Sequence, residues 1–159
     1  MTKTREELIA EFQNDDLELC AMTIAIDGHD QPLRYSQDMD EMPQRLHFVL
    51  PEKSTYTLTI RYRAKRPIRS LGYHQVVKKH GIPFDTRKLP IGDNIVPNTD
   101  DNPYHEVTFP PHTLPSGSLV RGKYPATSTF LENGKAIFSC EWIIEIVKRD
   151  RQPESKGFD

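Results

Sequence analysis

The chain has 159 residues, a formal net charge of −2 at pH 7 and a sequence pI near 6.3. This near-neutral balance argues against general binding to nucleic acid, which needs a basic stripe. No apolar run approaches the length of a membrane span, and the N-terminal residues lack the apolar core of a signal peptide. We therefore expect a cytoplasmic protein without membrane insertion, folded as a single domain that buries roughly two-thirds of its unfolded surface.

The first predicted element is a short helix near residues 5–13. Thr4 and Glu7 have the spacing of a capping box, in which each side chain satisfies a backbone amide of the first helical turn. Three apolar residues follow at helical spacing: Leu8, Ile9 and Phe12. Residues 1–16 are accordingly predicted to form a short N-terminal helical segment.

The remainder of the chain is predicted to consist of strands. Residues 55–65 alternate strictly between apolar and polar or cationic side chains, which is typical of an antiparallel strand with one face against a core. Similar segments, each bounded by Pro, Gly, Asn or Asp, predict strands at 17–26, 45–50, 55–65, 68–80, 82–91, 103–109, 118–124, 126–132 and 136–148. About nine short strands indicate an all-β sandwich over residues 17–150. Residues 151–159 are predicted to be a disordered tail.

Two connections stand out between these strands. Asn133-Gly134 separates the last two strands, and this dipeptide is the strongest local hairpin signal in the chain. Residues 92–103 are polar and rich in turn formers, so they are predicted to be a loop.

A catalytic function finds little support in the motifs. Residues 117–124 nearly spell a phosphate-binding P-loop, but Tyr124 replaces the short hydroxyl residue and more strand follows where a helix should begin. Cys20 and Cys140 lack CxxC spacing and are predicted to be buried thiols, and the six histidines show no metal-binding spacing. We therefore predict no catalytic residues, no cofactor and no metal.

Several blocks of the sequence occur in the order found in one known family. They are Met22-Thr23-Ile24, Gln44 to Ile68, Tyr73 to Asp85, Ile91-Gly92, Leu114 to Tyr124, and Ser139 to Ile144. Together these blocks resemble the Rho GDP-dissociation inhibitors, the carriers of prenylated Rho-family GTPases. The resemblance implies an immunoglobulin-like β-sandwich that is not an enzyme, and whose partners are a GDP-bound, prenylated Rho-family GTPase and its isoprenoid lipid. Such a carrier is expected to be a monomer when free.

The resemblance also implies site residues. The family's prenyl pocket falls on Ile24, Phe48, Tyr56, Ile68, Leu119, Trp142 and Ile144. Contacts with the GTPase fall on Leu8 and Phe12 of the helix and on the turn Glu132, Asn133 and Gly134. For each pocket residue, the alternative interpretation is an ordinary core position.

Three departures from the family pattern affect what is expected. Only about sixteen residues precede the first predicted strand, whereas the family's N-terminal arm folds as a helical hairpin on the GTPase. His112-Thr113 replaces an acidic pair, and Cys140 replaces the first of two tryptophans. We therefore expect membrane extraction to be retained and inhibition of GDP release to be weak.

Two alternatives stay open at the level of sequence. One is a general prenyl- or acyl-binding chaperone with little contact to the GTPase fold. The other is a small hydrolase on a sandwich scaffold, although no nucleophile is marked in the sequence.

Overall fold

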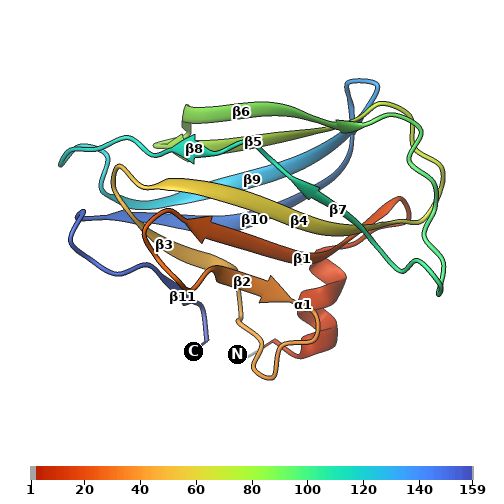
Figure 1. Cartoon of the computed structure of the whole chain (residues 1–159), viewed down its shortest axis with the longest axis horizontal. Helices are drawn as coiled ribbons and strands as arrows, with labels where there is room; N and C mark the ends of the chain where they lie inside the picture. Colours follow the sequence, from red (N-terminus) through yellow and green to blue (C-terminus); the bar gives the residue numbers. More distant parts are fainter. Residues whose placement is uncertain (1–2, 159) are drawn as a thin grey trace.

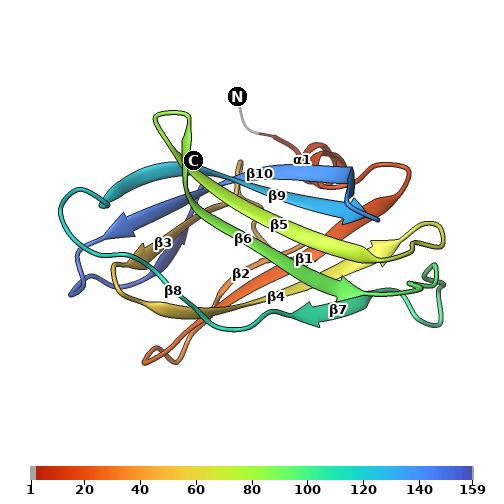
Figure 2. The same cartoon turned by 90° about the horizontal axis from the view of Figure 1, so that it is seen from above.

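A computed structural model describes residues 3–158, in which two β-sheets pack face to face (Figures 1 and 2). The first sheet contains β1 (Leu17–Ile26), β2 (Leu33–Ser36), β4 (Thr55–Ala64), β7 (His105–Thr108) and β8 (His112–Thr113). The second contains β3 (His47–Pro51), β5 (Leu71–Lys79), β6 (Ile82–Gly92), β9 (Gly122–Glu132), β10 (Lys135–Val147) and β11 (Glu154–Lys156). The predicted all-β sandwich is confirmed.

The first sheet has the strand order β2-β1-β4-β7, and β8 also pairs with β4. The predicted alternation in β4 sets its two faces, because Tyr56, Leu58 and Ile60 are buried while the intervening threonines are half-buried. Threonine hydroxyls meet across the outer face, where Thr59 and Thr108 lie 3.0 Å apart. One side of this sheet thus faces the core and the other is polar.

The second sheet has the order β11-β3-β10-β9-β5-β6, with β3 and β10 running parallel and the other neighbours antiparallel. The β9–β10 hairpin turns at Asn133 and Gly134, which have φ angles of 50° and 81°. Two successive positive φ values match the turn that Asn-Gly favours, so the predicted hairpin is confirmed.

Helix α1 (Arg5–Glu11) begins at Thr4, whose hydroxyl accepts a hydrogen bond of 3.1 Å from the Glu7 amide. The helix ends two residues before the predicted boundary, because the backbone leaves the helical region at Phe12. Residues 1 and 2 of the predicted helical segment lie outside the described residues, as does residue 159 of the predicted tail.

Other strand boundaries differ from the predictions. The two strands expected at 118–124 and 126–132 are one strand, β9, and the residues just before Gly122 form a turn. Pro125 is tolerated within β9 because β5 pairs with this strand only from Ala126 onward. The short strands β2 and β8 were not predicted.

The C-terminal tail also differs from the prediction of disorder. Strand β11 pairs antiparallel with β3, Glu154 opposite Val49 and Lys156 opposite His47. The reason is that β3 has only β10 on its other side, which leaves a row of backbone groups for the tail to bind.

Candidate functional site

The predicted pocket residues fall into two groups. Six of them are buried in one core cluster between the sheets, each no more than 3% exposed: Ile24, Phe48, Tyr56, Ile68, Trp142 and Ile144. The seventh, Leu119, is 80% exposed in the turn before β9, where its carbonyl accepts a hydrogen bond from Lys79. The structure therefore brings six of the seven together and leaves Leu119 on the surface.

A chain of buried hydrogen bonds runs through the same cluster. Trp142 Nε1 donates to Ser128 Oγ at 3.0 Å, and Ser128 Oγ lies 2.7 Å from the Tyr73 hydroxyl. The Tyr73 hydroxyl donates to Gln75 Oε1, and Gln75 Nε2 donates to the Tyr56 hydroxyl, each at 2.9 Å. Because β4 belongs to the first sheet and β5, β9 and β10 to the second, this chain joins the two sheets.

Sequence reasoning missed Ser128, Tyr73 and Gln75 as members of this cluster. Strand alternation could have revealed two of them, since it places the polar residues Gln75 and Ser128 at inward-facing positions of β5 and β9. Burial raises the pKa of Tyr73, although its hydrogen bond with Ser128 opposes the rise. The phenol therefore stays protonated and can serve as a donor in the chain.

A groove of about 700 Å³ lies beside Trp142, between α1 and the β9–β10 pair. Strand β3 pairs with β10 only from Ile143 onward, and the preceding part of β10 lies next to the helical segment, where Asn14 Nδ2 donates to the Ile137 carbonyl at 2.7 Å. Apolar residues that line the groove are Phe12, Leu46, Pro125, Cys140, Trp142 and Ile143, and polar or charged residues that line it are Lys3, Glu11, Arg45, Thr127, Ser139 and Glu141. The groove thus borders the buried cluster at Trp142, which is itself only 3% exposed.

A second cluster, of polar and aromatic side chains, connects the edge strand β6 of the second sheet to β8 of the first. His112 Nε2 on β8 lies 3.0 Å from each carboxylate oxygen of Asp85 on β6, and the His112 ring meets the Tyr56 ring edge-on. The Arg87 guanidinium lies 6.0 Å from the centre of the Tyr56 ring and donates to the Pro110 carbonyl at 2.8 Å. These contacts connect the second sheet to the first beside Tyr56, one of the predicted pocket residues.

The predicted helix contacts with a GTPase partner are not on the surface. Leu8 is fully buried and Phe12 is 3% exposed, with the Phe12 ring 5.3 Å from that of Tyr35. The apolar face of α1 packs on the chain's own sandwich, because the amphipathic pattern is satisfied there. The prediction that these two side chains meet a partner thus has no support from their position.

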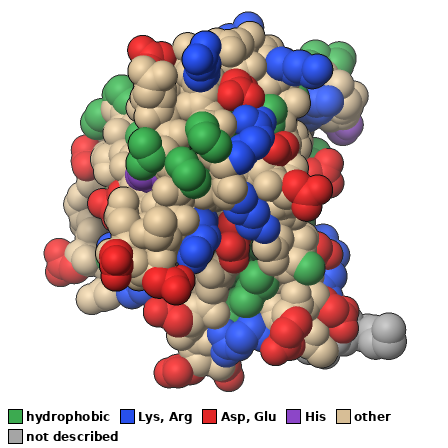
Figure 3. All heavy atoms as spheres, turned by 90° about the vertical axis from the view of Figure 1, so that its right-hand side faces the viewer, with side chains coloured by type: hydrophobic (Ala, Val, Ile, Leu, Met, Phe, Trp, Pro, Cys, Tyr) green, Lys and Arg blue, Asp and Glu red, His purple; other side chains and the backbone are tan. Residues whose placement is uncertain are grey.

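The predicted turn contacts lie at the end of the molecule drawn in Figure 3, where acidic and basic side chains are interspersed. Asn133 and Gly134 are exposed. Glu132 is engaged within the chain, since its two carboxylate oxygens accept from Arg66 Nη2 at 2.9 Å and from the Arg69 amide at 2.8 Å. Arg66 also lowers the pKa of Glu132, which keeps this carboxyl group ionised.

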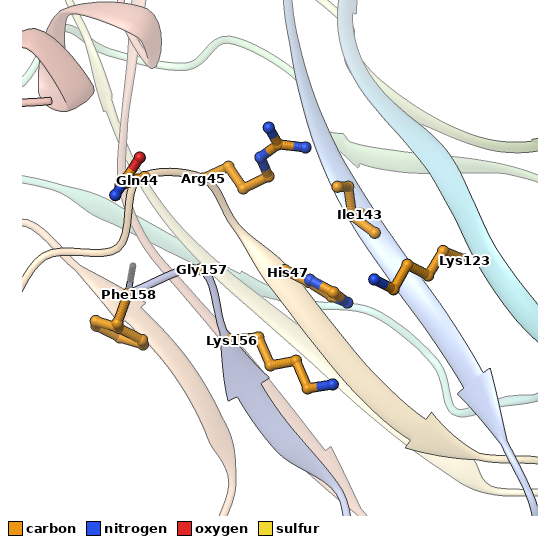
Figure 4. Close-up of a pocket in the computed structure, with 8 residues that line it drawn as sticks. All are labelled: Gln44, Arg45, His47, Lys123, Ile143, Lys156, Gly157 and Phe158. Carbon is orange, nitrogen blue, oxygen red and sulfur yellow. The ribbon is translucent and has the colours of Figure 1, made fainter. Parts of the chain in front are cut away.

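A cationic hollow of about 660 Å³ lies on the outer face of the second sheet (Figure 4). The His47 ring and the ends of Lys123 and Lys156 converge there. Glu145 lies 2.8 Å from His47 Nε2 and 3.7 Å from Lys156 Nζ. Glu145 therefore offsets only part of the positive charge that Arg45, Lys123 and Lys156 bring to the hollow.

The two cysteines behave as protonated thiols. Burial raises the pKa of Cys140 to about 12 and that of half-buried Cys20 to about 11. Within residues 3–158, no group of three or more His, Cys, Asp or Glu side chains is placed to hold a metal. In the same part of the chain, no helix is long and apolar enough to cross a membrane.

The fold and the buried cluster define a β-sandwich with an aromatic-walled interior. Residues 1–149 match the family model described as RHO protein GDP dissociation inhibitor. The chain is 36% identical over 104 residues to a Rho GDP-dissociation inhibitor of Saccharomyces cerevisiae, and 25% identical over 131 residues to one of Schizosaccharomyces pombe. It is also 35% identical over 92 residues to Rho GDP-dissociation inhibitor 1 of Arabidopsis thaliana. The chain belongs to the Rho GDP-dissociation inhibitor family.

The three alignments cover 64%, 80% and 57% of this chain. They cover 51%, 62% and 37% of the respective relatives, so the chain spans about half the length of the curated relatives it matches.

Proposed function

We propose that this chain binds prenylated Rho-family GTPases, shelters the isoprenoid between its two sheets and thereby carries the GTPase off membranes through the cytoplasm. The observation that carries this proposal is the gathering of six pocket residues in one core cluster, in a chain of this family. Family membership alone would leave open where a lipid could bind.

The interior suits a hydrocarbon because its walls are large and apolar. Phe48 and Trp142 pack with their ring centres 5.9 Å apart, and Ile24 and Ile144 are buried in the same cluster. These side chains fill the space in the described state, so a hydrocarbon would enter by displacing them as the sheets part. The groove beside Trp142 is the proposed entrance.

The free energy of burying the isoprenoid indicates that the pocket alone cannot extract a GTPase from a membrane. Burial of an isoprenoid stabilises the complex by ~0.8 kcal/mol per CH₂, or on the order of 10 kcal/mol in total, but a bilayer offers a similar gain. Transfer from membrane to protein is then nearly neutral. Contacts with the folded GTPase would supply the difference, and the exposed turn at Asn133 and Gly134 is the proposed contact surface.

We further propose that slowing of GDP release is weaker than membrane extraction. Leu8 and Phe12 point into the chain's own core, so α1 does not present its apolar face to a partner. The same observation favours a second candidate function, a general prenyl- or acyl-binding chaperone that makes little contact with the GTPase fold.

One experiment tests both candidates. Vesicles that carry geranylgeranylated Rho-GDP, and vesicles that carry an isolated prenylated peptide, are incubated with the protein, and the soluble fraction is measured. A GTPase carrier releases the former much better, whereas a general chaperone releases both alike. Failure to release either would overturn the proposed lipid binding.

A matched pair of variants locates the site in this assay. Trp142→Ala removes a wall of the proposed pocket and should reduce release, whereas Lys88→Gln changes an exposed side chain on β6 and should not. Trp→Ala in a core costs about 3–5 kcal/mol of stability. Because Trp142 is the single tryptophan of the chain, far-UV circular dichroism and urea unfolding must show that Trp142→Ala is folded.

A further inference from the structure

The cationic hollow on the outer face of the second sheet is built across four neighbouring strands, β11, β3, β10 and β9. Strand pairing places Lys123 of β9 opposite Glu145 of β10, and Lys156 of β11 opposite His47 of β3. Residues directly opposite on neighbouring strands point to the same face of a sheet. Lys123 and Lys156 therefore extend from the two outer strands over the two inner ones, and their ends converge beside the His47 ring (Figure 4).

The residues before β3 add a third cation, Arg45, to the lining of the hollow. The C-terminal tail approaches Arg45 closely because residue 157 is glycine. Gly157 has a φ of 101°, and a Cβ atom at this position would overlap the Arg45 carbonyl oxygen. The Gln44 amide also donates to the Gly157 carbonyl. The tail is thus held against the residues before β3, which gives the hollow a fixed wall.

The positive charge of the hollow is only partly paired within the chain. Lys156 Nζ lies 3.7 Å from Glu145 and 3.3 Å from Glu154. Within residues 3–158, Arg45 and Lys123 form no ion pair. Like charges that share a hollow repel each other, and an anion that contacts both of them removes this repulsion. Two unpaired cations beside a third therefore favour an anionic ligand.

The chemistry of these side chains indicates the kind of anion. A guanidinium forms two parallel hydrogen bonds to a phosphate group, and a lysine ammonium binds phosphate as a compact charge. The volume of about 660 Å³ is in the range of small-molecule sites. A single carboxylate would neutralise one of the two unpaired cations, whereas several phosphate groups on one small ring can contact all three.

We propose that the hollow binds a compact anion with several phosphate groups, of the inositol polyphosphate class, through Arg45, Lys123 and Lys156. The anion is either a free inositol phosphate or the headgroup of a phosphoinositide lipid, since the two present the same phosphate groups. The hollow lies on the outer face of the second sheet, whereas the proposed lipid pocket lies between the sheets. The inference is therefore independent of the proposed function, and either can fail without the other.

Two carboxylates near the hollow oppose an anion. Glu145 lies 2.8 Å from His47 Nε2 and its side chain is only 15% exposed, so it is held beneath the more exposed end of Lys156. Glu154 is half-exposed, and its carboxylate can turn towards water. Glu145→Gln keeps the size of the side chain and an acceptor for His47 but removes the negative charge. This variant should bind the anion a few-fold more tightly, a gain that a misfolded chain cannot give.

Calorimetry of the intact chain with inositol trisphosphate, at low and at physiological salt, tests the site. We expect binding at a single site that weakens as salt rises. The double variant Arg45→Gln/Lys123→Gln should bind at least about tenfold more weakly, because charge-assisted hydrogen bonds to phosphate are lost. The control Lys88→Gln/Lys135→Gln removes the same charge from exposed side chains outside the hollow and should bind like the intact chain. Urea unfolding checks that each variant is folded.

Vesicles of phosphatidylcholine, with and without phosphatidylinositol bisphosphate, distinguish the two sources of the anion. Binding of both the free trisphosphate and the bisphosphate vesicles assigns the site to the lipid headgroup, and binding of the free trisphosphate alone assigns it to a soluble anion. No binding of the free trisphosphate would overturn the inference even if the vesicles bind, because attraction to a charged membrane needs no site in the hollow. An equal loss in the two double variants would also overturn it, since the overall charge would then account for the affinity.

Discussion

Trp142 and Ser128 are joined by a hydrogen bond of 3.0 Å from the indole Nε1 to the Ser128 hydroxyl, inside the core and across neighbouring strands. Tyr73 gives its own proton to Gln75, so the Ser128 hydroxyl must donate to Tyr73. The direction of every bond from Trp142 to Gln75 is thereby fixed. Trp142 and Tyr56, which a lipid is proposed to displace, are thus held in place by a series of buried hydrogen bonds.

The first prediction concerns this chain. Ser128→Ala removes the acceptor of Trp142 and the donor to Tyr73, and leaves buried polar groups unpaired. We expect the variant to lower the free energy of unfolding by about 1–3 kcal/mol, measured by urea denaturation. Ser139→Ala is the control, because Ser139 is exposed and its Oγ lies at the surface, 3.0 Å from Thr129 Oγ1. Equal stability of the two variants would falsify the importance of the buried chain.

The second prediction concerns α1. Leu8→Ala should lower the free energy of unfolding by about 2–5 kcal/mol, because the Leu8 side chain is fully buried against the sandwich. Glu6→Gln, on the exposed face of the same helix, should change it by no more than about 0.5 kcal/mol. Urea unfolding of both variants makes the comparison. A stable Leu8→Ala variant that has lost only GTPase binding would instead support the partner contact first predicted for this residue.

The strands were predictable wherever one face is buried over several residues. In β4, alternation from Tyr56 to Ala64 reports directly on the core, because side chains in a strand point to opposite faces in turn. The short strands β2, β8 and β11 contain between two and four residues, too few for the alternation to be read. β11 in addition depends on an open strand edge that only the tertiary structure reveals.

The candidate site was less predictable than the fold. The buried positions of Phe48 and Trp142 follow from strand patterns, but the hydrogen bonds through Gln75 and Ser128 depend on how two sheets meet. An amphipathic helix has the same pattern whether it packs on its own chain or on a partner, so sequence could not decide where Leu8 points. The buried Arg87 likewise had no signal in the sequence, since its neighbours on β6 are polar and exposed.

The third prediction concerns the exposed turn. Asn133→Asp adds a carboxylate at a position where φ is 50°, a conformation that Asp tolerates. If the turn meets a basic surface of the GTPase, affinity for the prenylated GTPase should rise a few-fold at low salt, with a faster association rate. Affinity for an isolated prenylated peptide should not change, because the added charge lies on the surface and not in the pocket.

His80→Asp provides the control for the turn. His80 is also exposed and has a φ of 52°, and it follows β5 at the end opposite to the β9–β10 turn, because Leu71 pairs with Glu132 and Val77 with Ala126. Surface plasmon resonance of both variants at two salt concentrations separates a local contact from a general charge effect. An equal gain in the two variants would argue against contact at the β9–β10 turn.

The last prediction concerns alkaline pH. Burial raises the pKa of Tyr62 to about 12, and it also raises the pKa of Tyr35, Tyr56 and Tyr73 above the ordinary value near 10. Above pH 10 the unfolded chain therefore releases protons that the folded chain retains, and the free energy of unfolding must fall as pH rises. The stabilising effect of the neutral phenols is fully present below about pH 10 and is lost progressively towards pH 12.

Urea unfolding between pH 8 and pH 11, followed by near-UV circular dichroism, measures this loss. Tyr62→Phe is the informative variant, because it removes one phenol that ionises only in the unfolded chain and should make the decline with pH less steep. Absorbance at 295 nm reports tyrosinate directly, and the signal of the buried phenols should appear together with loss of the folded spectrum. Complete tyrosinate formation near pH 10 in a chain that keeps its folded spectrum would contradict the burial of these side chains.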